Sequence, residues 1–213
     1  MLSLAFECAG QGLSAALATS GGDQIGTTAL NMDRGQPAAL LPALHDLLDR
    51  HKLRPQDLDQ VGCTLGPGGF TGIRLGIAAG LGLARSSGAT FYGFNAFDVY
   101  ALGEPEPEGL CIAIESRRRE VFARVYARQG KGLALADTVL SPEDLMQTGL
   151  FSRVIGSAAS KLDPACLDQE PDMAKLARFM SSAPKNSAQL VKARDRSAPI
   201  YLRAPEIGGM KSS

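Results

Sequence analysis

The stretch from Gly66 to Ala84 places the strongest constraint on how this 213-residue chain can fold. A glycine-rich turn, Gly66-Pro67-Gly68-Gly69, follows an apolar run at 61–65. After the turn, the apolar residues recur at helical spacing. Free backbone N–H groups at the start of such a helix can cradle a phosphate. The turn matches neither G-x-G-x-x-G nor the lysine-bearing P-loop, so Gly68 and Gly69 are weak candidates for a cofactor site.

The same predicted helix carries a stripe of glycines. Gly72, Gly76 and Gly80 are four residues apart, which puts them on one face. Each glycine inside a helix costs about 1 kcal/mol relative to alanine, so the stripe suggests that a neighbour needs the space. We expect this neighbour to be a second helix or another subunit. The alternative is that the stripe packs on the sheet of its own domain.

The composition narrows the class of protein. Lys+Arg and Asp+Glu both number 22, so no net charge draws the chain to nucleic acid or membrane. No apolar run has the length of a transmembrane helix, and the first residues lack the pattern of a signal peptide, so we expect a cytoplasmic protein. The four cysteines form no C-x-x-C pair and are expected to be free thiols, and the two histidines lack metal-pair spacing.

The order of the predicted elements indicates an α/β fold. The first half reads as strands at 2–6, 13–19 and 24–32, a helix from 37 to 51, a strand at 59–65, the glycine helix to about 85, a strand at 90–94 and a helix through 102. This βββαβα order is that of one half of an actin-like ATPase lobe. One face of the first helix holds Leu40, Leu41, Leu44, Leu47 and Leu48, as either core or partner surface.

The second half repeats this outline after an acidic, proline-punctuated linker at 104–109. We predict strands at 110–115, 121–127, 133–140 and 153–157, with a short helix that begins at Pro142 and further helices at 171–181 and 188–192. The chain therefore divides into an N-terminal lobe, 1–103, and a C-terminal lobe, 104–213. The last segment can pack back on the first lobe, and 208–213 are expected to be disordered.

The glycine stretch also resembles a known family. Residues 66–76 resemble the G-P-G-S-F-T-G-L-R-I-G signature of the TsaB (YeaZ) family, with Gly69 in place of the serine. Supporting matches lie at 40–42, 119–122 and 199–203. The resemblance implies a two-lobe fold of the actin and sugar-kinase type (ASKHA, ribonuclease H-like). It also implies a role in making N6-threonylcarbamoyladenosine in tRNAs that read A-starting codons.

The resemblance further implies partners. The family is the non-catalytic relative of the catalytic subunit TsaD and pairs with it through helices of the first lobe. An ATPase, TsaE, joins the pair, and tRNA is contacted through the complex. A homodimer through the same face is expected when the partner is absent. The interface predicted for this chain consists of Leu40, Leu44, Leu47, Gly72, Ile73, Gly76 and Gly80.

Several substitutions argue against catalysis. TsaD carries an H-x-x-x-H metal pair where this chain has Gln36, and a single amide does not hold iron or zinc. Glu7-Cys8-Ala9-Gly10 stands where actin-like ATPases place an aspartate and a hydroxyl. We therefore expect no catalytic residue, no metal and no cofactor beyond weak ATP or ADP binding at the partner interface, with Glu7 as a weak candidate. The alternative functions are an ATP-dependent phosphotransferase or ATPase and, against the missing metal pair, a metallopeptidase.

Three consecutive arginines, Arg117 to Arg119, occupy a predicted hairpin turn. Such a cluster can grip tRNA phosphates. It can also be a solvated turn whose arginines pair with Glu115 and Glu120. The sequence leaves both interpretations open.

Overall fold

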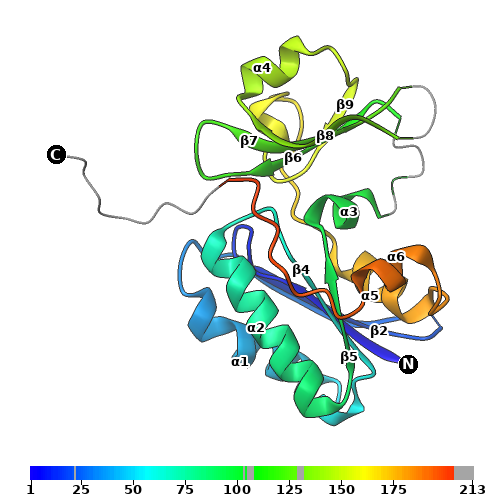
Figure 1. Ribbon diagram of the computed structural model, residues 1–213. Coiled ribbons are helices and arrows are strands. Elements are labelled where there is room, and N and C mark those ends of the chain that lie inside the picture. Colours follow the sequence, from blue (N-terminus) through cyan, green and yellow to red (C-terminus); the bar gives the residue numbers. More distant parts are fainter. Residues whose placement is uncertain (22, 103, 105–107, 129–131, 204–213) are drawn as a thin grey trace.

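The computed structural model describes residues 1–21, 23–102, 104, 108–128 and 132–203, and these form two lobes (Figure 1). Each lobe contains one mixed sheet. The strands are β1 (Leu2–Glu7), β2 (Leu13–Thr19), β3 (Gln24–Leu30), β4 (Gln60–Thr64), β5 (Thr90–Phe94), β6 (Leu110–Glu115), β7 (Val121–Tyr126), β8 (Leu133–Leu140) and β9 (Arg153–Ile155). The helices are α1 (Gln36–Arg50), α2 (Phe70–Ser87), α3 (Ala96–Ala101), α4 (Pro142–Gln147), α5 (Met173–Ser182) and α6 (Ala188–Ala193), with 3₁₀ turns at Pro55–Asp57 and Ala159–Lys161.

The first lobe is built on a five-stranded sheet in the order β3-β2-β1-β4-β5. β1 pairs antiparallel with β2 and parallel with β4. Successive side chains of a strand point to opposite faces, so β1 serves two cores. Leu4 and Phe6 pack in the core under α1 and α2, while Ala5 packs with α5 on the other face. The sheet is thus a middle layer between two pairs of helices (Figure 1).

The second lobe is a four-stranded sheet in the order β8-β7-β6-β9, which repeats the order of β3, β2, β1 and β4. Cys111 and Ala113 of β6 face a core that includes Leu145 of α4. Ile112 on the opposite face packs in a core that includes Phe97 of α3. Helix α3 therefore follows directly from the first sheet but covers the inner face of the second.

A buried arginine connects the lobes. Arg124 of β7, only 8% exposed, forms ion pairs with Asp98 of α3 and, at 2.6 Å, with Asp137 of β8. Asn95, the residue before α3, donates to the same Asp137 at 2.9 Å. These charge-assisted bonds fix the direction in which α3 leaves the first lobe.

The expected α/β two-lobe fold is confirmed, and the predicted elements agree with the observed ones to within two or three residues. The sequence also suggested that the last segment can pack back on the first lobe. Helices α5 and α6 pack on the first sheet together with Tyr92 and Phe94, so the chain after about residue 171 returns to the first lobe. The predicted disordered tail, 208–213, lies outside the described residues. None of the helices in the described part of the chain is long and apolar enough to cross a membrane.

Candidate functional site

The two lobes touch directly at the turn that follows β1. The guanidinium of Arg117, in the turn between β6 and β7, donates to the main-chain oxygen of Gly10 at 3.1 Å. The main-chain N–H of Gln11 donates to the carboxylate of Glu170 at 3.3 Å. Glu170 lies in the segment that leads into α5. Beside these contacts lie two pockets of opposite charge, which we name the acidic pocket and the basic pocket.

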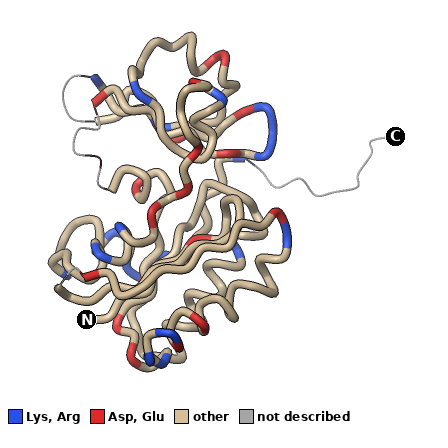
Figure 2. Tube along the Cα trace, turned by 180° about the vertical axis from the view of Figure 1, so that it is seen from behind, with Lys and Arg blue, Asp and Glu red and all other residues tan. Residues whose placement is uncertain are grey.

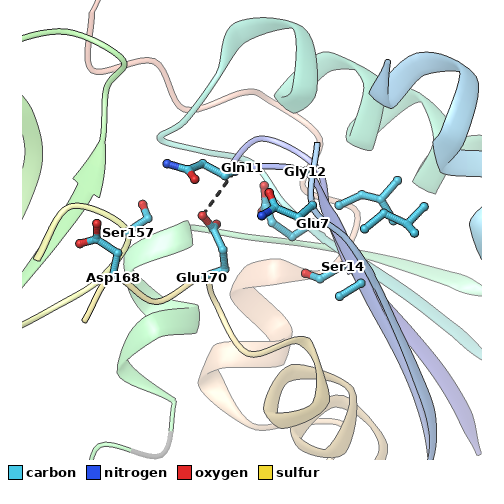
Figure 3. Close-up of a pocket in the computed structure, with 12 residues that line it drawn as sticks. Glu7, Gln11, Gly12, Ser14, Ser157, Asp168 and Glu170 are labelled. Atoms are coloured by element: carbon cyan, nitrogen blue, oxygen red, sulfur yellow. Dashed lines mark hydrogen bonds between the residues drawn. The ribbon is translucent and has the colours of Figure 1, made fainter. Parts of the chain in front are cut away.

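The acidic pocket has a volume of about 260 Å³ and holds Glu7 at the end of β1 (Figure 3). Glu170 and Asp168 from the second half of the chain line the same pocket, with Gln11, Ser14 and Ser157 as neutral polar neighbours. None of the described residues that line it is a lysine or an arginine. The pocket is therefore a concentration of negative charge at the lobe contact.

Glu7 is the most perturbed carboxyl of this pocket. Burial raises its pKa to about 7, with a smaller contribution from nearby Glu170, against the opposing effect of backbone N–H groups led by that of Ala9. One carboxylate oxygen, Oε1, accepts the N–H of Ala9, whereas Oε2 is buried without a hydrogen-bond partner among the described residues. Burial of this carboxyl therefore disfavours its charged form.

Glu170 is perturbed in the same direction. Burial is the largest cause of its raised pKa and Asp168 adds to it, while the Gln11 amide and Arg117 oppose the shift. Asp168 accepts bonds from the backbone and the hydroxyl of Ser160, each at 2.8 Å. Both glutamates thus occupy positions where burial and neighbouring carboxylates disfavour the charged form.

The basic pocket, of about 300 Å³, contains the glycine turn that the sequence singled out. Gly68 and Gly69 lie there beside Arg117, Arg118 and Arg203. The N–H of Gly69 is already donated to the carbonyl of Ala9 at 2.8 Å, so one of the turn's phosphate donors is occupied. The structure brings the glycines together with cations that are distant in the sequence. Glu7 lines the acidic pocket and also shares a smaller pocket with Gly68.

The three arginines of the turn between β6 and β7, Arg117 to Arg119, are all exposed. Glu115 pairs with Lys161 at 2.7 Å and Glu120 with Arg203 at 3.0 Å. Arg119 instead reaches Glu143 at 3.5 Å. Side chains from distant segments thus reach both carboxylates, and the nearby charge of Arg118 contributes to the lowered pKa of Glu120.

The metal-ligating residues do not converge. No group of three or more His, Cys, Asp or Glu side chains in the described part of the chain could hold a metal ion. Gln36 donates to the carbonyl of Met32 at 3.3 Å, and His45 pairs with Asp49 on the exposed side of α1. Cys8, Cys63 and Cys111 are buried free thiols, and burial raises the pKa of each.

The glycine stripe faces its own sheet, which corrects the preferred expectation. A Cβ at Gly72 would lie 2.6 Å from the Cα of Ala9, and one at Gly80 would lie 2.6 Å from the ring of Phe91. At Gly76 the nearest atom would be the sulfur of Cys8, at 3.4 Å. The glycines therefore let α2 lie close to the end of β1 and to β5. This is the alternative that the sequence left open.

The other predicted interface residues are also interior. Leu40, Leu44 and Leu47 of α1 and Ile73 of α2 are at most 1% exposed and belong to the first-lobe core. The helical spacing correctly grouped these side chains but could not tell which side met the sheet. The leucines that α1 and α2 expose are Leu41, at 53%, and Leu81, at 41%.

The segment at 199–203 lies across both lobes. Ile200 donates its N–H to the carbonyl of Leu65 at 2.7 Å and packs against the first-lobe core. Leu202 packs against the core under the second sheet. Between them, the ring of Tyr201 lies 4.5 Å from that of Phe70, and its hydroxyl accepts from Arg74 at 2.9 Å. The sequence marked this segment only by its family likeness.

Comparison with known proteins identifies the family. The family model described as TsaD, tRNA N6-adenosine threonylcarbamoyltransferase, matches residues 33–190. The chain belongs to this family. Its curated relatives include the tRNA threonylcarbamoyladenosine biosynthesis protein TsaB of Bacillus subtilis, which is 31% identical over 87 residues, 40% of this chain and 38% of the relative. TsaB of Escherichia coli is 30% identical over 110 residues, 49% of this chain and 48% of the relative.

These matches support assignment to the TsaB (YeaZ) branch of the family, although each covers less than half the length of the relative. A solved structure from Pseudomonas aeruginosa, described as an uncharacterised protein with similarity to peptidase YeaZ, shares the fold. Its TM-score is 0.70 at 23% identity, over 95% of this chain and 99% of that one. The expected family and its two-lobe α/β fold are thus confirmed.

Proposed function

We propose that this chain is a non-catalytic subunit in the biosynthesis of threonylcarbamoyladenosine in tRNA, and that it scaffolds and activates a TsaD-like catalytic subunit. Family membership supports the process. The environment of Glu7 supports the absence of catalysis. The pocket that Glu7 shares with Gly68 of the glycine turn measures only about 20 Å³, too little for a nucleotide phosphate, and the N–H of Gly69 is already donated to Ala9.

The proposed docking surface is the outer face of α1 and α2. One observation carries it: both helices are buried on the sheet side and still expose a leucine on the outer side, Leu41 and Leu81. Exposed apolar side chains with small neighbours such as Ala78 and Gly82 are suited to a close helical contact. This surface replaces the buried residues proposed from sequence. In the absence of the partner, a homodimer would use the same face.

The complex would include further components. A TsaE-like ATPase would join the pair, and tRNA would be contacted through the complex rather than by this chain alone. The equal numbers of basic and acidic residues, 22 of each, support the last point, and Figure 2 shows both kinds along the trace of each lobe. The chain would act in the cytoplasm. Any ATP or ADP binding by the isolated chain would be weak.

The docking proposal is tested by co-elution with the native TsaD-like protein in size-exclusion chromatography. Leu41→Glu and Leu81→Glu should each weaken association, because a carboxylate would be buried in the contact without a partner. Leu167→Glu and Leu133→Glu are matched controls, since these leucines are 81% and 46% exposed but belong to the second lobe. Unchanged co-elution of both α1 and α2 variants would refute this surface.

A second assay separates the scaffold from the alternative ATPase or phosphotransferase. Modification of tRNA should require this chain together with the TsaD-like protein, and the isolated chain should turn over no Mg-ATP. Tight Mg-ATP binding with turnover by the isolated chain would favour the enzyme instead. The basic pocket is the place where such an activity would have to reside, because it combines Gly68 and Gly69 with three arginines.

A further inference from the structure

A third cavity, separate from the acidic and basic pockets, lies where α3, α5 and α6 meet β5 and the second-lobe strand β7. Its volume is about 410 Å³, and it shares no lining residue with the other two. We call it the α3–α6 pocket. The proposed function uses none of its residues, so its role is a separate question.

The walls of the α3–α6 pocket are largely apolar and aromatic. Phe94 of β5, Phe179 of α5 and Leu102 after α3 come from the first lobe, and Tyr126 comes from the second. The rings of Phe94 and Phe179 stand edge to face with centroids 6.4 Å apart. Because Phe94 is almost fully buried, this pair is a fixed wall against which another ring can pack. Apolar pockets with a few polar groups are the usual form of small-ligand sites.

The charged groups of the pocket are not balanced. Its two carboxylates are already used: Asp98 pairs with Arg124, and Glu104 pairs with Arg153 at 2.7 Å. The two cations that line the pocket, Lys192 and Arg196, form no ion pair with any residue in the part of the chain that the structure describes. The pocket therefore offers two cations that are available for an ion pair beside an aromatic wall.

We propose that the α3–α6 pocket binds a small aromatic anion, such as an aromatic carboxylate. The ring of the ligand packs against Phe179 and Phe94, and its carboxylate pairs with the guanidinium of Arg196 and the ammonium of Lys192. A planar guanidinium can donate two parallel bonds to a carboxylate, which orients the ligand as well as holding it. A neutral aromatic molecule lacks this pairing, and an aliphatic anion lacks the ring contact.

Binding at this position would connect the lobes. The pocket is walled by helices of the first lobe and by Tyr126 of the second, beside the Asp98–Arg124 ion pair. A ligand in it contacts both lobes at once. It therefore favours the arrangement in which they are together.

The probe for the test is anilinonaphthalene sulfonate, an aromatic anion whose fluorescence rises in apolar surroundings, and its neutral counterpart is N-phenylnaphthylamine. The full chain should bind the sulfonate saturably at one site. The double variant Lys192→Gln/Arg196→Gln should bind it roughly tenfold more weakly, since two partly exposed charge pairs are lost. Binding of the neutral probe should not change. Arg178→Gln/Lys185→Gln is the matched control, because these are exposed cations nearby that do not line the pocket.

The variant Ala188→Trp, which should fill the α3–α6 pocket, tests whether the probe binds there. Ala188 is an exposed residue of α6 that lines the pocket, so an indole there should fill the cavity without disturbing the core. Circular dichroism reports on folding. Loss of sulfonate binding in Ala188→Trp, together with selective weakening in the charge variant, supports the proposal. Equal affinity of the wild-type chain and the charge variant, or full binding by folded Ala188→Trp, would overturn it.

Discussion

Arg117 of the second lobe donates a hydrogen bond to the main-chain oxygen of Gly10 in the first lobe. The arginine adopts a left-handed backbone conformation, with φ of 59°, which a non-glycine residue rarely does. Its own N–H is donated to Glu115, which fixes the turn. A side chain held in this way across two lobes acts as a clamp between them.

Loss of this clamp should widen the average separation of the lobes. We expect Arg117→Ala to increase the radius of gyration in small-angle X-ray scattering, because one of the two direct contacts at the β1 turn is removed. Arg119→Ala is the control, since Arg119 pairs with Glu143 within the second lobe. The same scattering curve for Arg117→Ala and wild type would show that Glu170 and the 199–203 segment suffice to hold the lobes.

Glu7 should make the protein less stable as the pH rises. Its folded pKa of about 7 lies above the ordinary value of 4.5, so between these values the folded state binds more protons than the unfolded state. The free energy of unfolding that is lost because Glu7 must ionise while buried is zero below about pH 4.5. It reaches its full value, roughly 3 kcal/mol, above about pH 7. The raised pKa of Glu170 acts in the same direction.

Denaturant unfolding at about pH 5 and about pH 8 measures this effect. Glu7→Gln should reduce the difference in unfolding free energy between the two conditions, whatever its effect at either one. Glu108→Gln, at an exposed position, should leave the difference unchanged. An undiminished pH dependence in Glu7→Gln would mean that the carboxyl is charged in the folded protein.

Substituting alanine for two different glycines of α2 should change the stability of the fold in opposite directions. A Cβ at Gly72 would meet the backbone of Ala9, so Gly72→Ala should destabilise the fold by about 1–3 kcal/mol. A Cβ at Gly82 would have no atom within 4 Å, so Gly82→Ala should stabilise the fold by up to about 1 kcal/mol through helix propensity. Thermal unfolding measures whether each variant is more or less stable than the wild-type chain. Stabilisation by Gly72→Ala would contradict the close contact of α2 with the β1 turn.

Tyr201 should contribute to stability mainly through its ring. Tyr201→Ala removes the packing on Phe70 and should lower the free energy of unfolding by about 2 kcal/mol. Tyr201→Phe removes only the bond from Arg74, which is exposed, and should cost less than about 1 kcal/mol. Chemical denaturation compares the two. Equal losses would instead assign the stabilisation to the hydroxyl.

Much of the fold was predictable because its signals are local. The turn after Leu65 and the apolar spacing of α2 indicated a strand, a turn and a helix, and the structure has β4, a turn and α2 at these positions. The repeated order of strands and helices indicated two related lobes, and the two sheets do repeat one strand order. Hydrophobic periodicity and glycine turns act over a few residues, so they can be read without the rest of the chain.

The candidate site was harder to predict from the sequence than the fold. The sequence singled out Glu7, Gly68 and Gly69, but nothing near Glu7 in the chain indicates Glu170, and nothing near Gly68 indicates Arg203. The basic pocket exists because the chain returns across both lobes after α6. Such contacts join residues more than a hundred positions apart, and a single sequence carries no local signal for them.

The glycine stripe shows most clearly which features local sequence predicts and which depend on the folded chain. Spacing alone places Gly72, Gly76 and Gly80 on one face of a helix and leaves space there, because helical geometry depends only on spacing. What fills that space, Ala9, Cys8 and Phe91 of the helix's own lobe, follows from how the chain packs. The same packing turned Leu40 inward and left Leu41 outside. A helix has one pattern of faces, but the direction of each face is set by the surfaces that the folded chain brings against it.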